Sequence, residues 1–253
     1  MSTPPPRSAA YFDQWYADMA RSPVKDETMQ RHLGLPPHVL PNNSLPWAGV
    51  AEVTQALALR PGQRLLDLAC GRGSVGLEVA GRTGAALVGV DFSAEALRRA
   101  RASATKLGST ADFVLGRLED TGLPDASVDA VVCIDSVQFS GPPEAVFGEV
   151  RRVLRPGGRL AATCWEVVDP EDERVPARLR GVHLEDQLRA AGFTDVDVVD
   201  RPRWRELELA FWAEAATLDP GDDPALQSFH GEGVGALAYA DAVRRVLATA
   251  TAP

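Results

Sequence analysis

The chain has 253 residues, of which 45% are hydrophobic and 24% are charged. This composition is that of a globular domain with its own core, and it excludes a disordered or collagen-like chain. The 35 acidic residues outnumber the 26 basic ones and give a net charge of -9, which repels phosphate backbones and argues against a nucleic-acid partner.

The apolar runs at 84–90 and 130–134 are far shorter than the ~20 residues that a membrane helix requires. We therefore expect no membrane partner. The first residues lack the basic and apolar regions of a secretion signal, which predicts a cytoplasmic protein. The cysteines Cys70, Cys133 and Cys164 lie far apart inside apolar runs, so we expect buried thiols and neither a disulfide nor a metal site.

The N-terminal part, residues 9–60, is predicted to form a helical lid behind a disordered tail at residues 1–8. The tail is a run of Pro, Ser and Thr that buries nothing to offset its ordering entropy. Aromatic residues recur at helical spacing from Ala9 onward, and a second helix is predicted over 47–59 behind Pro46. The segment between these helices is rich in Pro and Asn, and we interpret it as a linker.

Residues 61–202 alternate between strand and helix patterns with short turns. Such alternation specifies a parallel sheet that is covered by helices on both faces. The predicted strands lie at 64–69, 86–90, 112–115, 129–134 and 158–164, and the helices between them at 75–81, 94–107 and 143–154.

The C-terminal part completes the predicted fold. A helix at 183–191 and a strand at 194–199 close the core, and the amphipathic residues 203–240 are predicted to form a helical cap. Residues 241–253 are predicted to hold a last strand over 243–250 and a tail. The fold class is therefore α/β and doubly wound: a mostly parallel, seven-stranded Rossmann-like sheet with N-terminal helices and a helical cap.

A glycine-rich turn follows the first predicted strand of the core. Gly71, Gly73 and Gly76 have the G-x-G-x-x-G spacing, and Asp91 ends the next strand 20 residues after Gly71. In a dinucleotide site, glycines at this spacing let the ligand approach the backbone closely, and the acid at the end of the second strand binds the ribose hydroxyls. Asp67 lies four residues before the turn, where its charge would repel a diphosphate and attract an ammonium group. The pattern favours a cofactor with a ribose and a cationic amino-acid arm, as in S-adenosylmethionine.

Four segments in order then carry a family resemblance: LLDLACGRG at 65–73, VGVDFS at 88–93, LPDASVD at 123–129 and EVRRVLRPGGRL at 149–160. With these segments the chain resembles the class I S-adenosylmethionine-dependent methyltransferases, and in particular the small-molecule branch that includes the ubiquinone-biosynthesis-type enzymes. The resemblance covers residues 57 to 165, and the flanks are not diagnostic.

The resemblance implies a set of cofactor contacts. Asp67 and the turn at 71–73 would hold the methionine end, Asp91 the ribose diol, and Phe92 the adenine. The implied cofactor-binding residues are Asp67, Ala69, Gly71, Gly73, Asp91, Phe92, Arg117, Leu118, Glu119 and Asp135. The chain departs from the family where Arg117 follows Gly116 in place of an acid, so the adenine would be held mainly by backbone groups around Leu118.

The catalytic and acceptor residues are predicted less sharply. The histidine pair that relatives often carry after the fourth strand is replaced here by Asp135-Ser-Val-Gln-Phe139. Asp135, at the ligand-binding edge of the sheet, is the acid expected nearest the reacting atoms, where it acts in catalysis or orients the cofactor ammonium. His230 is a second catalytic candidate and also fits a solvated loop. The predicted acceptor-binding residues are Tyr16, Gln138, Phe139, Trp165 and Trp212.

The function expected from the sequence is S-adenosylmethionine-dependent methyl transfer to a small organic molecule, aromatic or apolar, by in-line displacement. Oxygen, nitrogen and carbon all stay open as the methylated atom, and the oligomeric state stays open as well. Three alternatives remain: a cofactor-binding module without catalysis, an NAD-dependent oxidoreductase, which leaves Asp67 unexplained, and a nucleic-acid methyltransferase, which the net charge opposes.

Overall fold

The structure is a computed structural model that describes residues 8–253. The tail predicted at residues 1–8 lies outside the described residues except for Ser8. Ser8 is the N-cap of the first helix, and its Oγ accepts a hydrogen bond of 3.2 Å from the N–H of Tyr11. The first described helix begins at Ala9, where helical spacing begins in the sequence.

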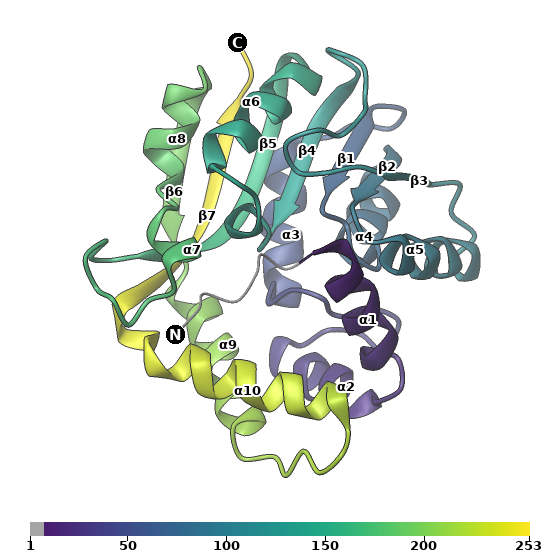
Figure 1. The fold of residues 1–253 in the computed structure, drawn as a ribbon. Helices are drawn as coiled ribbons and strands as arrows, with labels where there is room; N and C mark the ends of the chain where they lie inside the picture. The colour runs from purple at the N-terminus through teal and green to yellow at the C-terminus, as the bar shows by residue number, and fades with distance from the viewer. Residues whose placement is uncertain (1–7) are drawn as a thin grey trace.

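A seven-stranded sheet forms the centre of the molecule (Figure 1). The strands β1 to β5 pair in parallel, and β7 runs antiparallel to both β5 and β6. This confirms the predicted fold class and the last strand. In the order β3-β2-β1-β4-β5-β7-β6, the strands are β1 (Arg64–Leu68), β2 (Ala86–Asp91), β3 (Asp112–Leu115), β4 (Val128–Ile134), β5 (Leu154–Val167), β6 (Thr194–Asp200) and β7 (Val243–Thr251).

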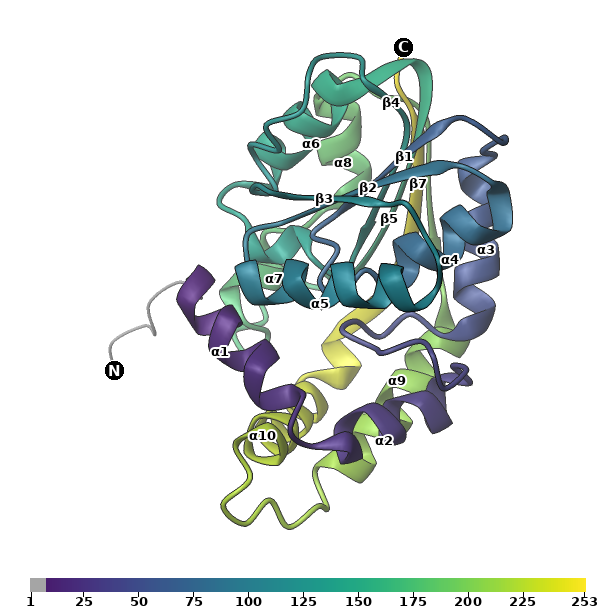
Figure 2. The same ribbon diagram turned by 90° about the vertical axis from the view of Figure 1, so that its right-hand side faces the viewer.

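Helices cover both faces of the sheet (Figure 2). One face packs against α3 (Trp47–Leu57), α4 (Ser74–Thr83) and α5 (Ala94–Lys106), and the other against α6 (Pro143–Val153) and α8 (Leu184–Ala190), with the short α7 (Ala177–Arg180) near the end of β5. Successive strand residues such as Leu65 and Leu66 enter different cores, because side chains alternate across a strand. Each fully buried Leu or Val contributes roughly 1.5–3 kcal/mol.

Four helices lie together beyond the carboxyl ends of the parallel strands (Figures 1 and 2). They are α1 (Ala9–Met19), α2 (Pro23–Leu33), α9 (Pro202–Ala215) and α10 (Pro224–Ala238), and we call them the cap. Helices α2, α9 and α10 share a small core that includes Met29, Leu33, Phe211 and Phe229. The helices predicted as an N-terminal lid and as a C-terminal cap thus pack against each other.

Helix α2 corrects the sequence analysis, which interpreted this segment as part of a linker. Pro23 stands in the first turn, where its missing N–H costs nothing, and Gly34 ends the helix in the left-handed conformation at φ 67. The other predicted elements differ from the structure only at their ends. The helix predicted to reach Leu59, for example, ends at Leu57 because Ala58 is left-handed.

Two further expectations concern thiols and membranes. Cys70, Cys133 and Cys164 are free and buried, as predicted, and burial raises the pKa of each thiol above its usual range. Within residues 8–253, no helix combines the length and the apolar composition needed to cross a membrane.

Candidate functional site

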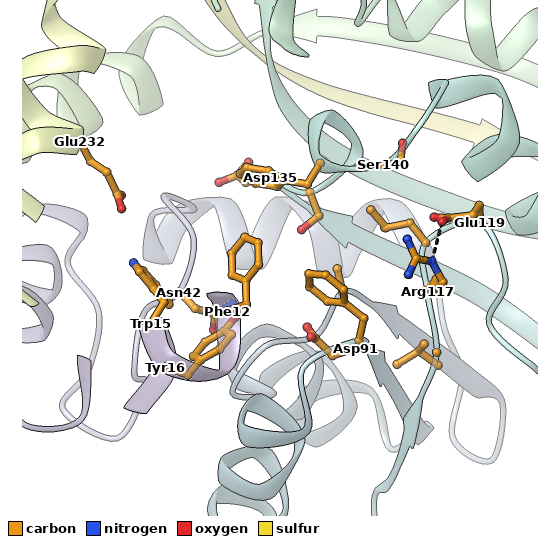
Figure 3. A pocket seen from close by; sticks show the side chains of 17 residues that line it. Phe12, Trp15, Tyr16, Asn42, Asp91, Arg117, Glu119, Asp135, Ser140 and Glu232 are labelled. Carbon is orange, nitrogen blue, oxygen red and sulfur yellow. Dashed lines mark hydrogen bonds and ion pairs between the residues drawn. The ribbon is translucent and has the colours of Figure 1, made fainter. Parts of the chain in front are cut away.

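Two cavities lie between the sheet and the cap. The edge cavity, of about 160 Å³, follows the carboxyl ends of β1 to β4 (Figure 3). It is lined by Phe12, Trp15, Tyr16, Asn42, Ala69, Val90, Asp91, Phe92, Gly116, Arg117, Leu118, Glu119, Asp135, Ser136, Phe139, Ser140 and Glu232. The cap cavity is larger, about 520 Å³, and reaches from the end of β5 into the cap. Trp15, Asn42, Asp135, Phe139 and Glu232 line both cavities, so the two adjoin.

Asp91 fixes the glycine turn to the end of β2. One carboxylate oxygen accepts the N–H of Gly71 at 2.8 Å, and the other accepts the N–H of Ser93 at 2.9 Å. Burial raises the pKa of Asp91, while these backbone hydrogen bonds lower it. Since Asp91 also lines the edge cavity, it both shapes the turn and presents a carboxylate to a ligand there.

Asp67 lies beneath the same turn and lines neither cavity. Its Oδ2 accepts the N–H of Gly76 at 3.0 Å, and a methyl group at Gly76 would lie only 2.5 Å from that oxygen. The residue is 3% exposed, and burial raises its pKa to about 7. Gly71 and Gly73 are also absent from the cavity walls. Contact of these three residues with a cofactor stays a prediction, and the geometry gives Asp67 a positioning role at the start of α4.

Tyr16 and Asn42 cover the glycine turn from the cap side (Figure 3). Gly71 has φ 53, and a methyl group there would lie 2.6 Å from the Tyr16 hydroxyl and would also collide with Asn42. The Asn42 Oδ1 atom is buried without a hydrogen-bond partner in the part of the chain that the structure describes. An unsatisfied amide oxygen at a cavity wall favours a ligand with a hydrogen-bond donor. The sequence analysis named Tyr16 and missed Asn42.

The β2 and β3 side of the edge cavity is partly aromatic. The ring of Phe12 lies 5.3 Å from that of Phe92 and 5.9 Å from that of Phe139. Arg117 pairs with Glu119 at 2.7 Å on the exposed rim. Ala69 and Leu118 also line this cavity, so all predicted cofactor residues except Asp67, Gly71 and Gly73 come together here.

Asp135 stands where the two cavities meet, and its backbone is strained at φ 53. Its carboxylate accepts the hydroxyl of Thr163 at 2.6 Å and the N–H of Ser44 at 2.9 Å. Arg245, which is fully buried, donates to it at 2.6 Å. These three donors satisfy the carboxylate, and Asp135 is therefore a wall residue held in place rather than a free base.

Arg245 also connects Asp135 to the cap. Its Nε lies 3.1 Å from Glu208 Oε2, and the other oxygen of Glu208 accepts the indole N–H of Trp165 at 2.8 Å and that of Trp212 at 3.3 Å. Burial raises the pKa of Glu208, and the neighbouring Asp135 raises it further, while Arg245 lowers it. One buried network thus fixes two predicted acceptor residues, Trp165 and Trp212, in the wall of the cap cavity.

The remaining predicted acceptor residues divide between the cavities. Gln138 lines the cap cavity, Phe139 lines both, and Tyr16 lines the edge cavity. His230 lies on α10 but lines neither cavity, although its neighbours Gly231 and Glu232 do. Glu208, Arg245 and Lys25 were not predicted from the sequence. The signal of Lys25 was its rarity, because only Lys25 and Lys106 are lysines.

With this geometry in place, comparison with known proteins identifies the central segment. Residues 66–162, which contain the end of β1, all of β2 to β4 and most of β5, match the family model described as a methyltransferase domain. The sterol 24-C-methyltransferase ERG6B of Gibberella zeae is 34% identical over 118 residues, which are 46% of this chain and 31% of that protein. The chain therefore spans about a third of the length of the curated sterol methyltransferases that it matches. The predicted family resemblance is confirmed.

Solved structures extend the likeness in fold to nearly the whole chain. The crystal structure of the cyclase SpnF has a TM-score of 0.75 at 24% identity and covers 97% of this chain and 96% of that one. Phosphoethanolamine N-methyltransferase 2 of Haemonchus contortus, in complex with S-adenosyl-L-methionine, has a TM-score of 0.71 at 20% identity over 94% of this chain and 60% of that one. The arrangement of core and cap is thus an established fold.

Proposed function

We propose that this chain, which carries a methyltransferase domain over residues 66–162, transfers a methyl group from S-adenosylmethionine to a small organic molecule. One observation carries the proposal. The strands of the segment that matches the family end at the edge cavity, where Asp91 lies beside a glycine turn. The edge cavity adjoins a second, larger cavity. A cofactor and an acceptor that occupy adjoining cavities meet the first requirement of in-line transfer.

The edge cavity fits the cofactor by its donor and acceptor groups. Asp91 would accept the ribose hydroxyls, Phe92 would pack against the adenine, and the unsatisfied Asn42 Oδ1 and the Tyr16 hydroxyl would meet the methionine end. When bound, S-adenosylmethionine supplies an electrophilic methyl group on a sulfonium. The chain's own residues bind and orient it, and the aromatic wall at Trp15 and Phe139 favours the sulfonium by cation–π attraction worth ~0.5–2 kcal/mol.

The cap cavity is proposed as the acceptor site. Its walls include Trp15, Phe139, Trp165 and Trp212, which suit a planar or apolar molecule. In this proposal the cap helices, with the loop that carries Asn42, act as one cover that excludes water from the reacting atoms. The predicted lid at 9–60 is corrected at α3, which packs on the sheet instead. Asp135 would orient the acceptor or the cofactor at the boundary between the cavities.

The three alternative functions are less favoured, and the experiment is designed to distinguish them from methyl transfer. SpnF is described as a cyclase, so a shared fold alone does not decide that a methyl group is transferred. The sterol and phosphoethanolamine methyltransferases that this chain resembles lend no support to the NAD-dependent and nucleic-acid alternatives. A cytoplasmic location is proposed on the sequence expectation alone.

Calorimetry with S-adenosylhomocysteine tests the cofactor site. We expect the native chain to bind it, and Asp91→Ala to weaken binding roughly 10- to 100-fold, because a charge-assisted hydrogen bond is lost. Asp91→Asn, which keeps the side-chain shape, is the second variant. Asp112→Ala, at the exposed start of β3, is the matched control. Absence of binding by the native chain, or equal binding by folded Asp91 variants, would contradict the proposal. Mass spectrometry of an acceptor panel then shows whether a methyl group is gained.

A further inference from the structure

Lys25 is a buried cation in the wall of the cap cavity. It lies on α2, is 3% exposed, and lines that cavity. Its Nζ lies 5.1 Å from the ring centroid of Trp15 and 5.9 Å from that of Phe229, and it donates to the sulfur of Met29 at 3.3 Å. In residues 8–253 it forms no ion pair with a carboxylate, so soft and aromatic groups are its nearest partners.

The charges around Lys25 leave it short of a counter-ion. Asp26, on the same helix, pairs with Arg72 at 2.8 Å, and Glu232 on α10 accepts the Ser228 hydroxyl at 2.9 Å. Burial lowers the pKa of Lys25 to about 8 and Arg72 lowers it as well, while Asp26 and Glu232 raise it. The amine is thus mainly protonated near pH 7, at a site where an unpaired charge is costly.

The rest of the cap cavity is suited to a flat ligand. Trp15, Phe139, Trp165, Trp212 and Tyr239 contribute aromatic surface to a space of about 520 Å³. Aromatic walls favour a ring system, and a buried cation favours one negative group on it. The two preferences together define a chemical class of ligand.

Building on the proposed function, we propose that the acceptor is a planar, apolar molecule with one anionic oxygen group, and that the Lys25 ammonium binds this group. The aromatic walls hold the ring, and the ion pair with Lys25 fixes its orientation relative to the edge cavity. An ion pair formed away from water is screened little, so the orientation is strongly favoured.

Four other charged residues line the cap cavity. The carboxylates of Asp135 and Glu208 are already paired with Arg245, which leaves Arg178 and Glu232. Arg178 is exposed at the rim, with its guanidinium carbon 5.8 Å from the ring centroid of Phe139, so water screens its charge. Glu232 lines both cavities and would repel an anion near the boundary between them. The anionic group is therefore expected at Lys25, the buried cation of the wall.

A matched pair of fluorescent probes tests the proposal without a known acceptor. Anilinonaphthalene sulfonate is planar, apolar and anionic, and phenylnaphthylamine has the same rings without the sulfonate. We expect Lys25→Met to weaken binding of the anionic probe roughly 10- to 100-fold and to leave the uncharged probe unchanged. Lys106→Met, at the exposed end of α5, is the control that removes the other lysine. Arg178→Met tests the competing cation.

The pH dependence gives a second readout. Affinity for the anionic probe should fall as the pH rises above about 8, where Lys25 loses its proton, and affinity for the uncharged probe should not change. The proposal is overturned if neither probe binds the native chain, if Lys25→Met weakens both probes equally or neither, or if only Arg178→Met matters. Binding of S-adenosylhomocysteine by Lys25→Met, measured in parallel, shows that the variant is folded. If the native chain does not bind S-adenosylhomocysteine, the proposed function is rejected, and the result with the two probes is still valid.

Discussion

The sheet edge and the cap satisfy their buried charges in different ways. At the sheet edge, Asp91 and Asp67 accept backbone N–H groups of the adjacent glycine turn. Between the sheet and the cap, charges are satisfied by side chains from distant elements: Arg245 of β7 lies between Asp135 and Glu208, and Arg72 of the glycine turn pairs with Asp26 of α2. The carboxylates of the edge are therefore satisfied by nearby backbone groups, whereas the junction of the sheet with the cap depends on pairs that form only when the whole chain has folded.

This difference explains what could be predicted from the sequence. A carboxylate that binds a nearby turn leaves a local pattern, so the glycine spacing and Asp91 were found. The pair between Asp135 and Arg245 joins residues 110 positions apart, and no local pattern marks it. The variants below separate the two kinds of support, in order of decreasing expected effect.

Loss of Arg245 should have the largest effect. Arg245→Met leaves the buried Glu208 and the half-buried Asp135 without the cation that they share, and we expect it to lower the free energy of unfolding by ~3–5 kcal/mol. Urea denaturation measures this. Arg203→Met, which removes an exposed pair with Glu206 on α9, is the control and should cost less than ~1 kcal/mol.

A triple variant sharpens that test. Arg245→Met combined with Asp135→Asn and Glu208→Gln removes the uncompensated charges, so much of the lost stability should return. If the single variant is as stable as the Arg203 control, the cap does not depend on this network and the comparison with the sheet edge fails.

Asp67 should make the free energy of unfolding depend on pH. Its pKa is raised from 3.8 to about 7 in the folded chain, so between these values the folded state keeps a proton that the unfolded chain has lost. This contribution to stability is complete below about pH 4 and is lost as the pH rises through about 7. At ~1.4 kcal/mol per pH unit, the loss is on the order of 4 kcal/mol at most.

The substitution Asp67→Asn should remove this slope. We expect the variant to gain stability relative to the native chain as the pH rises from 4 to 8, since it never has to ionise a buried group. Denaturation at several pH values measures the difference, with Asp112→Asn at an exposed position as the control. Parallel pH profiles for Asp67→Asn and the native chain would show that Asp67 is solvated in solution.

Some of the missed residues did leave a signal in the sequence. Pro23 and Gly34 bracket α2, but the Pro- and Asn-rich composition of the segment favoured a linker. Arg244 and Arg245 are adjacent in β7, where side chains alternate between faces, and their side chains are 46% and 0% exposed. The alternation indicates that one of the two is buried. It does not identify Asp135 and Glu208 as the partners, because burial of a charge depends on groups that only the tertiary structure brings near.

The smallest expected effect lies where the two regions touch, at Gly71. Gly71→Ala forces a side chain into a left-handed backbone at φ 53 and pushes it against Tyr16 and Asn42 of the cover. Gly62→Ala has the same backbone problem at φ 83 with nothing within 4 Å, so it isolates the backbone strain, which we expect to cost ~1–2 kcal/mol.

Thermal denaturation measures the loss of stability in both variants. The amount by which the loss in Gly71→Ala exceeds the loss in Gly62→Ala comes from separating the cover from the sheet edge. That excess should be about 1 kcal/mol and should be accompanied by weaker binding of S-adenosylhomocysteine. Equal losses in the two variants would mean that Tyr16 and Asn42 move aside without cost, and that they do not fix the cover to the glycine turn.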